Sequence, residues 1–297
     1  MLSFDLLSQI FSIVAPVLLC TGVGYIWGLL KRPFDPGITT ALVSAIAAPC
    51  LVFSALTRLE VSASALGQLA AATFACYVSM GALGWTVLRV VGLPAHSYLP
   101  ALMFPNGGNV GLPLCFLAFG AEGLALGIAW FAVGAVGQFT VGINIAAGSF
   151  AIGKLVRQPI LYAIALAFVF ILLGHKPPVW LSRSTEIMGN MLIPLMLLSL
   201  GVSLATLKVT RPVRAAALSA LRLVGGFLVG LTVAWAFGLT GAARGVLIIQ
   251  SAMPVAIFNY LFALQYKREP ADVAGMIVIT TVVSFISLPA LLLYVLP

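Results

Sequence analysis

Residues 102–113 read LMFPNGGNVGLP and interrupt a run that is otherwise apolar enough to cross a membrane. Prolines inside a helix remove backbone hydrogen bonds, and glycines weaken helical order, so a continuous helix is not expected here. Within a bilayer, interrupted backbone persists only where protein or a water-filled cavity satisfies its polar groups. The stretch therefore predicts a discontinuous transmembrane helix with its break near mid-membrane, where secondary transporters build substrate sites.

The composition of the whole chain indicates a membrane protein. Of its 297 residues, 62% are hydrophobic and only 7% are charged. A soluble domain with this composition would expose large apolar surfaces to water. The apolar runs are long and continuous, unlike the alternating segments of outer-membrane barrels. We therefore expect an all-α polytopic membrane protein in the lipid bilayer.

Charged residues divide the chain into ten uncharged runs. Each run is near or above the length of about 20 residues that a helix needs to cross the hydrocarbon core. The runs are 6–30, 36–57, 61–88, 90–121, 123–153, 158–174, 187–207, 223–243, 245–266 and 273–297. The sequence thus predicts ten transmembrane helices. No basic segment precedes the first run, so we expect it to remain as a span and not to act as a signal peptide.

Basic residues in the short loops predict the orientation. Loops after odd-numbered spans carry Lys31, Arg32, Arg89, Lys154, Arg157, Lys208, Arg211, Arg214, Lys267 and Arg268, whereas the other loops carry Arg58, Lys176, Arg183 and Arg244. The positive-inside rule then places the odd-numbered loops in the cytoplasm and both termini outside, in a multi-pass protein of the inner membrane. These scattered residues also account for the net charge of +8, so no nucleic-acid partner is expected.

The two halves of the chain repeat their special features at one spacing. Pro49 in the second run corresponds to Pro194 in the seventh, 145 residues later, and Pro105 corresponds to Pro254, 149 residues later. Because each half has five spans, an odd number, the two repeats would cross the membrane in opposite directions. The pattern predicts a 5+5 inverted repeat with broken crossover helices 4 and 9, which is a transporter architecture.

The two predicted breaks supply candidate substrate-binding groups. A half-helix that begins at mid-membrane directs free N–H groups and a positive dipole end toward the cavity, which suits a carboxylate. We expect Asn106 and Asn109 to donate amide hydrogens, with helix capping as their alternative role. Gly107 and Gly108 would let the backbone approach a ligand. The residues expected to form the crossover are Pro105, Gly111, Pro113, Ser251 and Pro254.

Further polar residues are candidates at or near the breaks. Pro254 fits the first turn of the second half-helix and completes the substrate site, together with Gln250 at the break and Ser54 after the second-span proline. Gln138 in the fifth span either contacts substrate or makes an interhelical hydrogen bond worth about 0.6 kcal/mol. Arg222 is expected to snorkel to the cytoplasmic boundary, with a substrate counter-ion as the alternative.

Small residues and cysteines have structural interpretations. The spacings Gly24-x-x-x-Gly28 and Gly226-x-x-x-Gly230 permit close helix packing, which we expect within one chain and not between chains. The four cysteines, Cys20, Cys50, Cys76 and Cys115, lie inside apolar runs at no metal-like spacing. We therefore expect no disulfide, no metal site and no cofactor.

Three motifs in this sequence resemble the auxin efflux carrier family, which includes plant PIN auxin transporters and bacterial carriers of malonate or malate. Residues 106–114 (NGGNVGLPL) look like the family's Asn-x-Gly-x-x-Gly-x-Pro signature. Residues 194–204 (PLMLLSLGVSL) resemble its span-7 motif. Ala252-Met253-Pro254, followed by Phe262-Ala263 and Tyr266, resembles its span-9 crossover.

The resemblance implies that the chain forms two structural parts, a scaffold and a transport domain. A scaffold would comprise residues 1–60 (helices 1 and 2) and 154–207 (helices 6 and 7), and would also form a homodimer. A transport domain of residues 61–153 (helices 3–5) and 208–297 (helices 8–10) would move like an elevator. The resemblance also implies substrate contact by Gln138. Asn109 stands where plant members often have an aromatic residue, which favours a smaller, more polar substrate than an indole.

We therefore expect an elevator-type secondary transporter of small organic anions such as carboxylates, and not an enzyme. No Asp or Glu lies in any of the ten runs, so movement driven by the membrane potential is preferred to proton coupling. A sodium-coupled symporter of the bile-acid type stays open, because carbonyl, Asn and Gln oxygens can bind Na⁺. An intramembrane enzyme would lack an embedded histidine or acid pair, and a passive receptor would have no use for two costly helix breaks. The pattern leaves open the substrate and the direction of transport.

Overall fold

The computed structural model describes residues 4–58, 63–148, 159–207 and 209–296, and these are helical apart from short connections. The basic residues Lys154, Arg157 and Lys208, used above for orientation, lie outside the described residues. In chain order the elements are α1 (Phe4–Leu29), α2 (Pro36–Leu42), the π-helical turn η1 (Val43–Ala47), α3 (Ala48–Arg58), α4 (Ala63–Val90), α5 (Ala95–Met103), the π-helical turn η2 (Gly107–Gly111), α6 (Leu112–Gly137), the π-helical turn η3 (Gln138–Gly142), α7 (Ile143–Ala147), α8 (Pro159–Leu172), α9 (Val179–Asn190), α10 (Leu192–Thr206), α11 (Pro212–Ala236), α12 (Gly241–Ser251), α13 (Ile257–Gln265) and α14 (Pro270–Val295).

Several of these helices are suited to a bilayer. Among the described residues, five segments are both long and apolar enough to span one: Gly67–Val90, Gly107–Ala147, Val179–Thr206, Pro212–Ala236 and Pro270–Val295. An all-helical fold with several candidate membrane spans is thus confirmed for the described residues. The count of ten spans stays a prediction, because α12 has 11 residues and α13 has nine, each too short to cross the hydrocarbon core alone.

The segment Gly107–Ala147 turns back on itself at Gly120. Gly120 has φ 63° and ψ −148°, a conformation that glycine adopts readily and side chains disfavour. The two arms of α6 then pack together, since a Cβ on Gly127 would lie 3.2 Å from Cβ of Cys115 and from Cδ2 of Leu112. This segment is therefore a helical hairpin, and its turn lies two residues before Glu122, the charge that separates the fourth and fifth runs.

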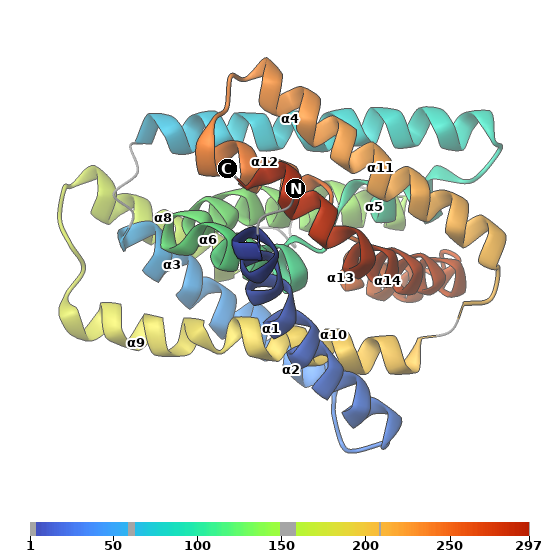
Figure 1. Ribbon diagram of the computed structural model, residues 1–297, viewed down its shortest axis with the longest axis horizontal. Coiled ribbons are helices and arrows are strands. Elements are labelled where there is room, and N and C mark those ends of the chain that lie inside the picture. The colour runs from blue at the N-terminus through green and yellow to red at the C-terminus, as the bar shows by residue number, and fades with distance from the viewer. Residues whose placement is uncertain (1–3, 59–62, 149–158, 208, 297) are drawn as a thin grey trace.

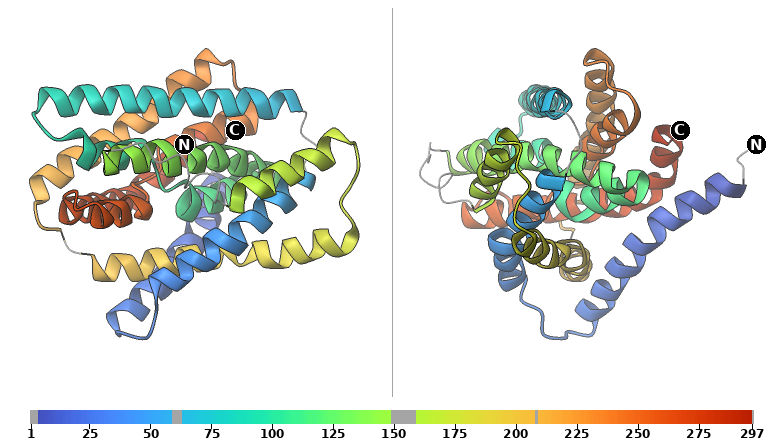
Figure 2. Two further views of the ribbon diagram at one scale, coloured as in Figure 1. Left: turned by 180° about the vertical axis from the view of Figure 1, so that it is seen from behind. Right: turned by 90° about the vertical axis from the view of Figure 1, so that its left-hand side faces the viewer.

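The helices form a layered bundle. Figure 1 shows α4 along one side of the molecule and α9 and α10 along the opposite side, with α6, α12 and α14 between them. In one set of contacts α1 packs against α10, and α3 packs against α8 and α9. In another set α4, α6, α11, α12 and α14 contact one another. The N-terminal part of α1 extends away from the other helices (Figure 2).

Glycines permit the closest helix crossings. A Cβ on Gly24 of α1 would lie 2.9 Å from Cα of Leu198 in α10, and a Cβ on Gly28 would lie 2.8 Å from Cβ of Ala205. In the same way, a Cβ on Gly230 of α11 would lie 2.8 Å from Cβ of Ser251 in α12. The prediction that these small residues serve packing within one chain is confirmed.

The crossing of α1 and α10 gives a testable prediction. Gly24→Ala should destabilise the protein by about 1–3 kcal/mol, because the new methyl group meets backbone atoms of Leu198 in α10, which cannot turn aside as a flexible side chain can. Gly22→Ala is the matched control, since a Cβ there meets nothing within 4 Å. Thermal unfolding in detergent would measure both variants. Equal melting temperatures for the two would contradict the close crossing.

A buried carboxylate joins three helices near the ends of α5, α11 and α14. Asp272 is 1% exposed, and its Oδ2 accepts hydrogen bonds from the hydroxyl of Tyr98 (2.6 Å), Nη1 of Arg211 (3.1 Å) and Nη1 of Arg214 (3.3 Å). Arg211 also pairs with the exposed Glu269 at 2.8 Å. Hydrogen bonds with Asp272 and Glu269 raise the pKa of Arg211. Asp272 was not among the predicted functional residues, because it directly precedes the last uncharged run.

Candidate functional site

The two stretches that the sequence analysis singled out meet in the middle of the bundle. Helix α5 ends at Met103 and η2 begins at Gly107, while α12 ends at Ser251 and α13 begins at Ile257. We call the intervening residues, 104–106 and 252–256, the crossing. There the two backbones pair in antiparallel fashion: Asn106 N donates to Pro254 O (2.6 Å), and Ala256 N donates to Phe104 O (3.3 Å).

Side chains satisfy other backbone groups of the crossing. Nδ2 of Asn259 donates to Phe104 O at 2.9 Å, and Oγ1 of Thr280 accepts from Val255 N at 3.1 Å. Both side chains are buried. Without water, each unpaired backbone group would cost several kcal/mol, so these partners make the irregular backbone possible inside a membrane.

Arg222 lies under the crossing and not at the membrane boundary, so the expectation that it snorkels is wrong. Its side chain is 1% exposed. The guanidinium donates to Leu102 O (2.8 Å), to Met253 O (3.3 Å) and, by a short contact, to Ser251 O. Helix α11 begins at Pro212 and carries Arg222 into its middle, where carbonyl groups at two helix C-termini replace water as hydrogen-bond partners.

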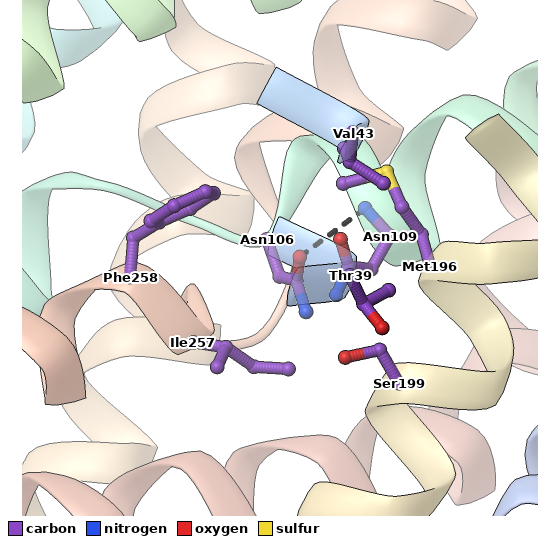
Figure 3. A pocket seen from close by; sticks show the side chains of 8 residues that line it. All are labelled: Thr39, Val43, Asn106, Asn109, Met196, Ser199, Ile257 and Phe258. Atoms are coloured by element: carbon purple, nitrogen blue, oxygen red, sulfur yellow. Dashed lines mark hydrogen bonds between the residues drawn. The ribbon is translucent and has the colours of Figure 1, made fainter. Parts of the chain in front are cut away.

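A small pocket lies on another face of the crossing. Its volume is about 40 Å³, enough for about three water molecules or for one carboxylate group. Figure 3 shows the side chains around it, with Asn106, Asn109, Thr39 and Ser199 close together and Phe258 at the edge. The full lining is Thr39, Val43, Asn106, Asn109, Met196, Ser199, Ile257 and Phe258, which we call the Asn106 pocket.

The polar groups of the Asn106 pocket suit an anion. Oδ1 of Asn106 accepts from Asn109 N at 3.2 Å and so caps η2, while Nδ2 of Asn106 is buried without a partner among the described residues. The N-terminal ends of η2 and α13 also border the pocket, and such ends carry partial positive charge. Both roles weighed for the asparagines, capping and donation to a ligand, are therefore compatible with this geometry.

The glycines of the signature leave space for neighbouring side chains. A Cβ on Gly107 would lie 2.6 Å from Cζ3 of Trp130, and a Cβ on Gly108 would lie 2.8 Å from Cε of Met196. A Cβ on Gly111 would lie 2.7 Å from Cδ of Gln250. These contacts show what packs against η2, and the expected approach of ligand to Gly107 and Gly108 stays a prediction.

The remaining predicted residues lie around the crossing and not in the Asn106 pocket. Gln250 is fully buried behind η2, and neither atom of its amide has a partner among the described residues. Gln138 donates to Oδ1 of Asn259 at 3.3 Å, which matches the interhelical alternative. Ser54 is buried in α3. Pro254 lies three residues before α13 and not in its first turn, because its carbonyl is engaged by Asn106.

Of the crossover residues, Pro105 pairs with Val255 across the crossing, and Pro113 is in the first turn of α6. Sequence reasoning missed Thr39 and Thr280, for which no motif gave a signal. Met196 and Ser199 lie in the span-7 motif quoted above, so that motif contained two pocket residues that were not singled out. Within the described residues no group of His, Cys, Asp and Glu side chains could hold a metal ion.

Known proteins similar to this chain are transporters. Residues 146–292 match the family described as "Membrane transport protein". An uncharacterized transporter of Methanocaldococcus jannaschii is 26% identical over 92% of this chain and 95% of its own length. Another, from Methanothermobacter thermautotrophicus, is 26% identical over 93% and 95%. Auxin efflux carrier component 1 of Arabidopsis thaliana is 32% identical over 48% of this chain and 23% of its own length.

Proposed function

We propose that this chain, a transporter of the membrane transport protein family, moves small organic anions such as carboxylates. Its similarity to an auxin efflux carrier supports the proposal. The observation that carries the proposal is the unpartnered Nδ2 of Asn106, buried in a pocket that two helix N-termini border. Such a site binds a carboxylate through N–H groups and dipoles without needing a cationic side chain. Its small volume favours a short substrate.

The proposed architecture is a 5+5 inverted repeat of ten spans. The fourth span would be α5 with η2 and the first arm of α6, and the ninth would be α12 with α13. Each of these spans is interrupted at the crossing. There Asn106 N of the fourth span donates to Pro254 O of the ninth, and Ala256 N of the ninth donates to Phe104 O of the fourth. Both termini would lie outside the inner membrane, as the loop charges predict.

The lining of the Asn106 pocket supports an elevator mechanism within this proposal. Thr39, Val43, Met196 and Ser199 come from the proposed scaffold, residues 1–60 and 154–207, whereas Asn106, Asn109, Ile257 and Phe258 come from the proposed transport domain. A site at the boundary between two bodies opens when one body slides along the other. Homodimers through the scaffold complete the proposal, and exposed apolar residues of α1, such as Phe11, Leu19 and Ile26, suit contact with lipid or with a second copy.

Uptake into proteoliposomes tests this function. Labelled malonate, malate and indole-3-acetate would be offered with and without a potassium diffusion potential, and with sodium and pH gradients imposed separately. We expect uptake of malonate or malate that increases with an inside-positive potential and exceeds the signal of protein-free liposomes. Transport of indole-3-acetate alone would contradict the small polar substrate, and no flux of any carboxylate would contradict the proposed substrate class.

A further inference from the structure

The crossing has one face that donates hydrogen bonds and one that accepts them. The donating face is the Asn106 pocket. The accepting face consists of Leu102 O in the last turn of α5, Ser251 O at the end of α12 and Met253 O just beyond it. In continuous helices the N–H groups of residues 106 and 255 would bond Leu102 O and Ser251 O, but these N–H groups donate to Pro254 O and to Oγ1 of Thr280. The carbonyls are therefore free to bind a cation.

Such a cluster of carbonyls attracts positive charge. Each helix C-terminus carries about half a negative charge, and here two of them converge inside the protein. In secondary transporters, carbonyls at broken helices and half-helix C-termini coordinate the coupling ion, Na⁺ or H⁺. None of the described residues that line the small cavity beside Arg222, among them Cys76, Tyr77 and Ser251, is acidic. A cation at this position would thus be held by carbonyls alone.

Arg222 supplies that cation from within the chain. All three carbonyls accept from its guanidinium, through Nη1, Nε and Nη2. The next turn of α11 leaves space for these hydrogen bonds, because it carries Gly226, which has no Cβ. A Cβ at this position would lie 3.0 Å from Nη2 of Arg222 and would also meet Ser251 O. Gly226 therefore lets the end of α12 approach the guanidinium closely.

We infer that the guanidinium of Arg222 is a resident cation in the position that a coupling Na⁺ would occupy, and that this chain transports without sodium. A coupling ion must bind and leave in every cycle, whereas a guanidinium on α11 is covalently retained. Arg222 is thus a positioning residue that joins the C-termini of α5 and α12, not a group that binds substrate. The inference deepens the proposed function and rests on it for the consequence to transport.

Sodium binding tests the inference without any substrate. Purified wild-type protein, Arg222→Ala and Arg222→Lys would be melted in NaCl, KCl and choline chloride at equal ionic strength, and ²²Na⁺ binding would be measured by scintillation proximity. We expect no saturable ²²Na⁺ binding and no sodium-specific shift for wild type or Arg222→Lys. Arg222→Ala should melt lower in KCl, and NaCl should restore about 3 °C or more by filling the vacated site.

Three outcomes would overturn the inference. One is saturable ²²Na⁺ binding by the wild-type protein, and another is carboxylate uptake that requires a sodium gradient. The third is Arg222→Ala protein that melts lower by the same amount in all three salts, because a purely structural role predicts that result. If Arg222→Ala does not fold, the wild-type ²²Na⁺ measurement still tests the inference, because saturable binding would overturn it. Absence of carboxylate flux would count against the proposed function alone, since binding and melting need no substrate.

Discussion

Asn106→Asp is expected to lower carboxylate uptake by about 100-fold or more at alkaline pH while leaving the melting temperature close to that of the wild type. The substituted side chain keeps an oxygen in the place of Oδ1, so it can still accept from Asn109 N and cap η2. The unpartnered Nδ2 becomes a second oxygen, so the pocket loses its donor and gains a negative charge. Binding of an anion should then fail through repulsion.

Two further variants separate capping from substrate binding. Asn106→Ala should also abolish transport, and should destabilise the protein by about 1 kcal/mol because the cap of η2 is lost. Asn190→Asp makes the same chemical change at an exposed position at the end of α9 and should transport at the wild-type rate. Initial uptake rates per folded protein are the measurement. Wild-type transport by Asn106→Asp would show that substrate binds elsewhere.

Asp272→Asn should lower the free energy of unfolding by about 3 kcal/mol. One oxygen of the buried carboxylate, Oδ2, accepts from one hydroxyl and two guanidinium groups. A neutral amide oxygen can take its place but removes the negative charge that balances the two guanidinium groups. An Asn Nδ2 turned toward either guanidinium would place donor against donor. Because α5, α11 and α14 all meet at this carboxylate, the loss should affect cooperative unfolding of the whole bundle and not one helix end.

The control for this prediction is Glu269→Gln, which removes the other partner of Arg211. Glu269 is 44% exposed in its side chain, and exposed ion pairs contribute little, so the change should stay within about 0.5 kcal/mol. Thermal melting in detergent would compare the two variants. Equal destabilisation by both, or none by Asp272→Asn, would contradict the assignment of the stabilising effect to the buried carboxylate.

Local sequence features predicted where regular structure stops. Prolines and glycines disrupt helices through their own covalent structure, so Pro105, Gly107 and Pro254 indicated irregular backbone at residues that lie between helices or in a π-helical turn. The small-residue spacing of Gly24 and Gly28 likewise predicted a close helix crossing. The position of Pro254 relative to α13 was missed, because a pairing across the crossing and not local propensity decides where that helix begins.

Partners distant in the sequence escaped the same reasoning. Arg222 lies 120 residues from Leu102, so nothing in its own segment showed that carbonyls of two other helices surround it. Thr39 gave no signal for the same reason, since only the packing of α2 near η2 and α10 brings it to the Asn106 pocket. Asp272 directly precedes the last uncharged run, and this position in the sequence did not show that packing buries the residue almost completely.

The sequence by itself therefore determined that this chain is a helical membrane protein and that its backbone is irregular near Pro105 and Pro254, because apolar content and backbone restriction belong to each residue alone. The tertiary structure decided which groups satisfy those interruptions. Hydrogen bonds from Arg222, Asn259 and Thr280 depend on distances between segments, and these distances arise only when the helices pack. In a medium without water, that packing determines which polar groups remain free for a ligand.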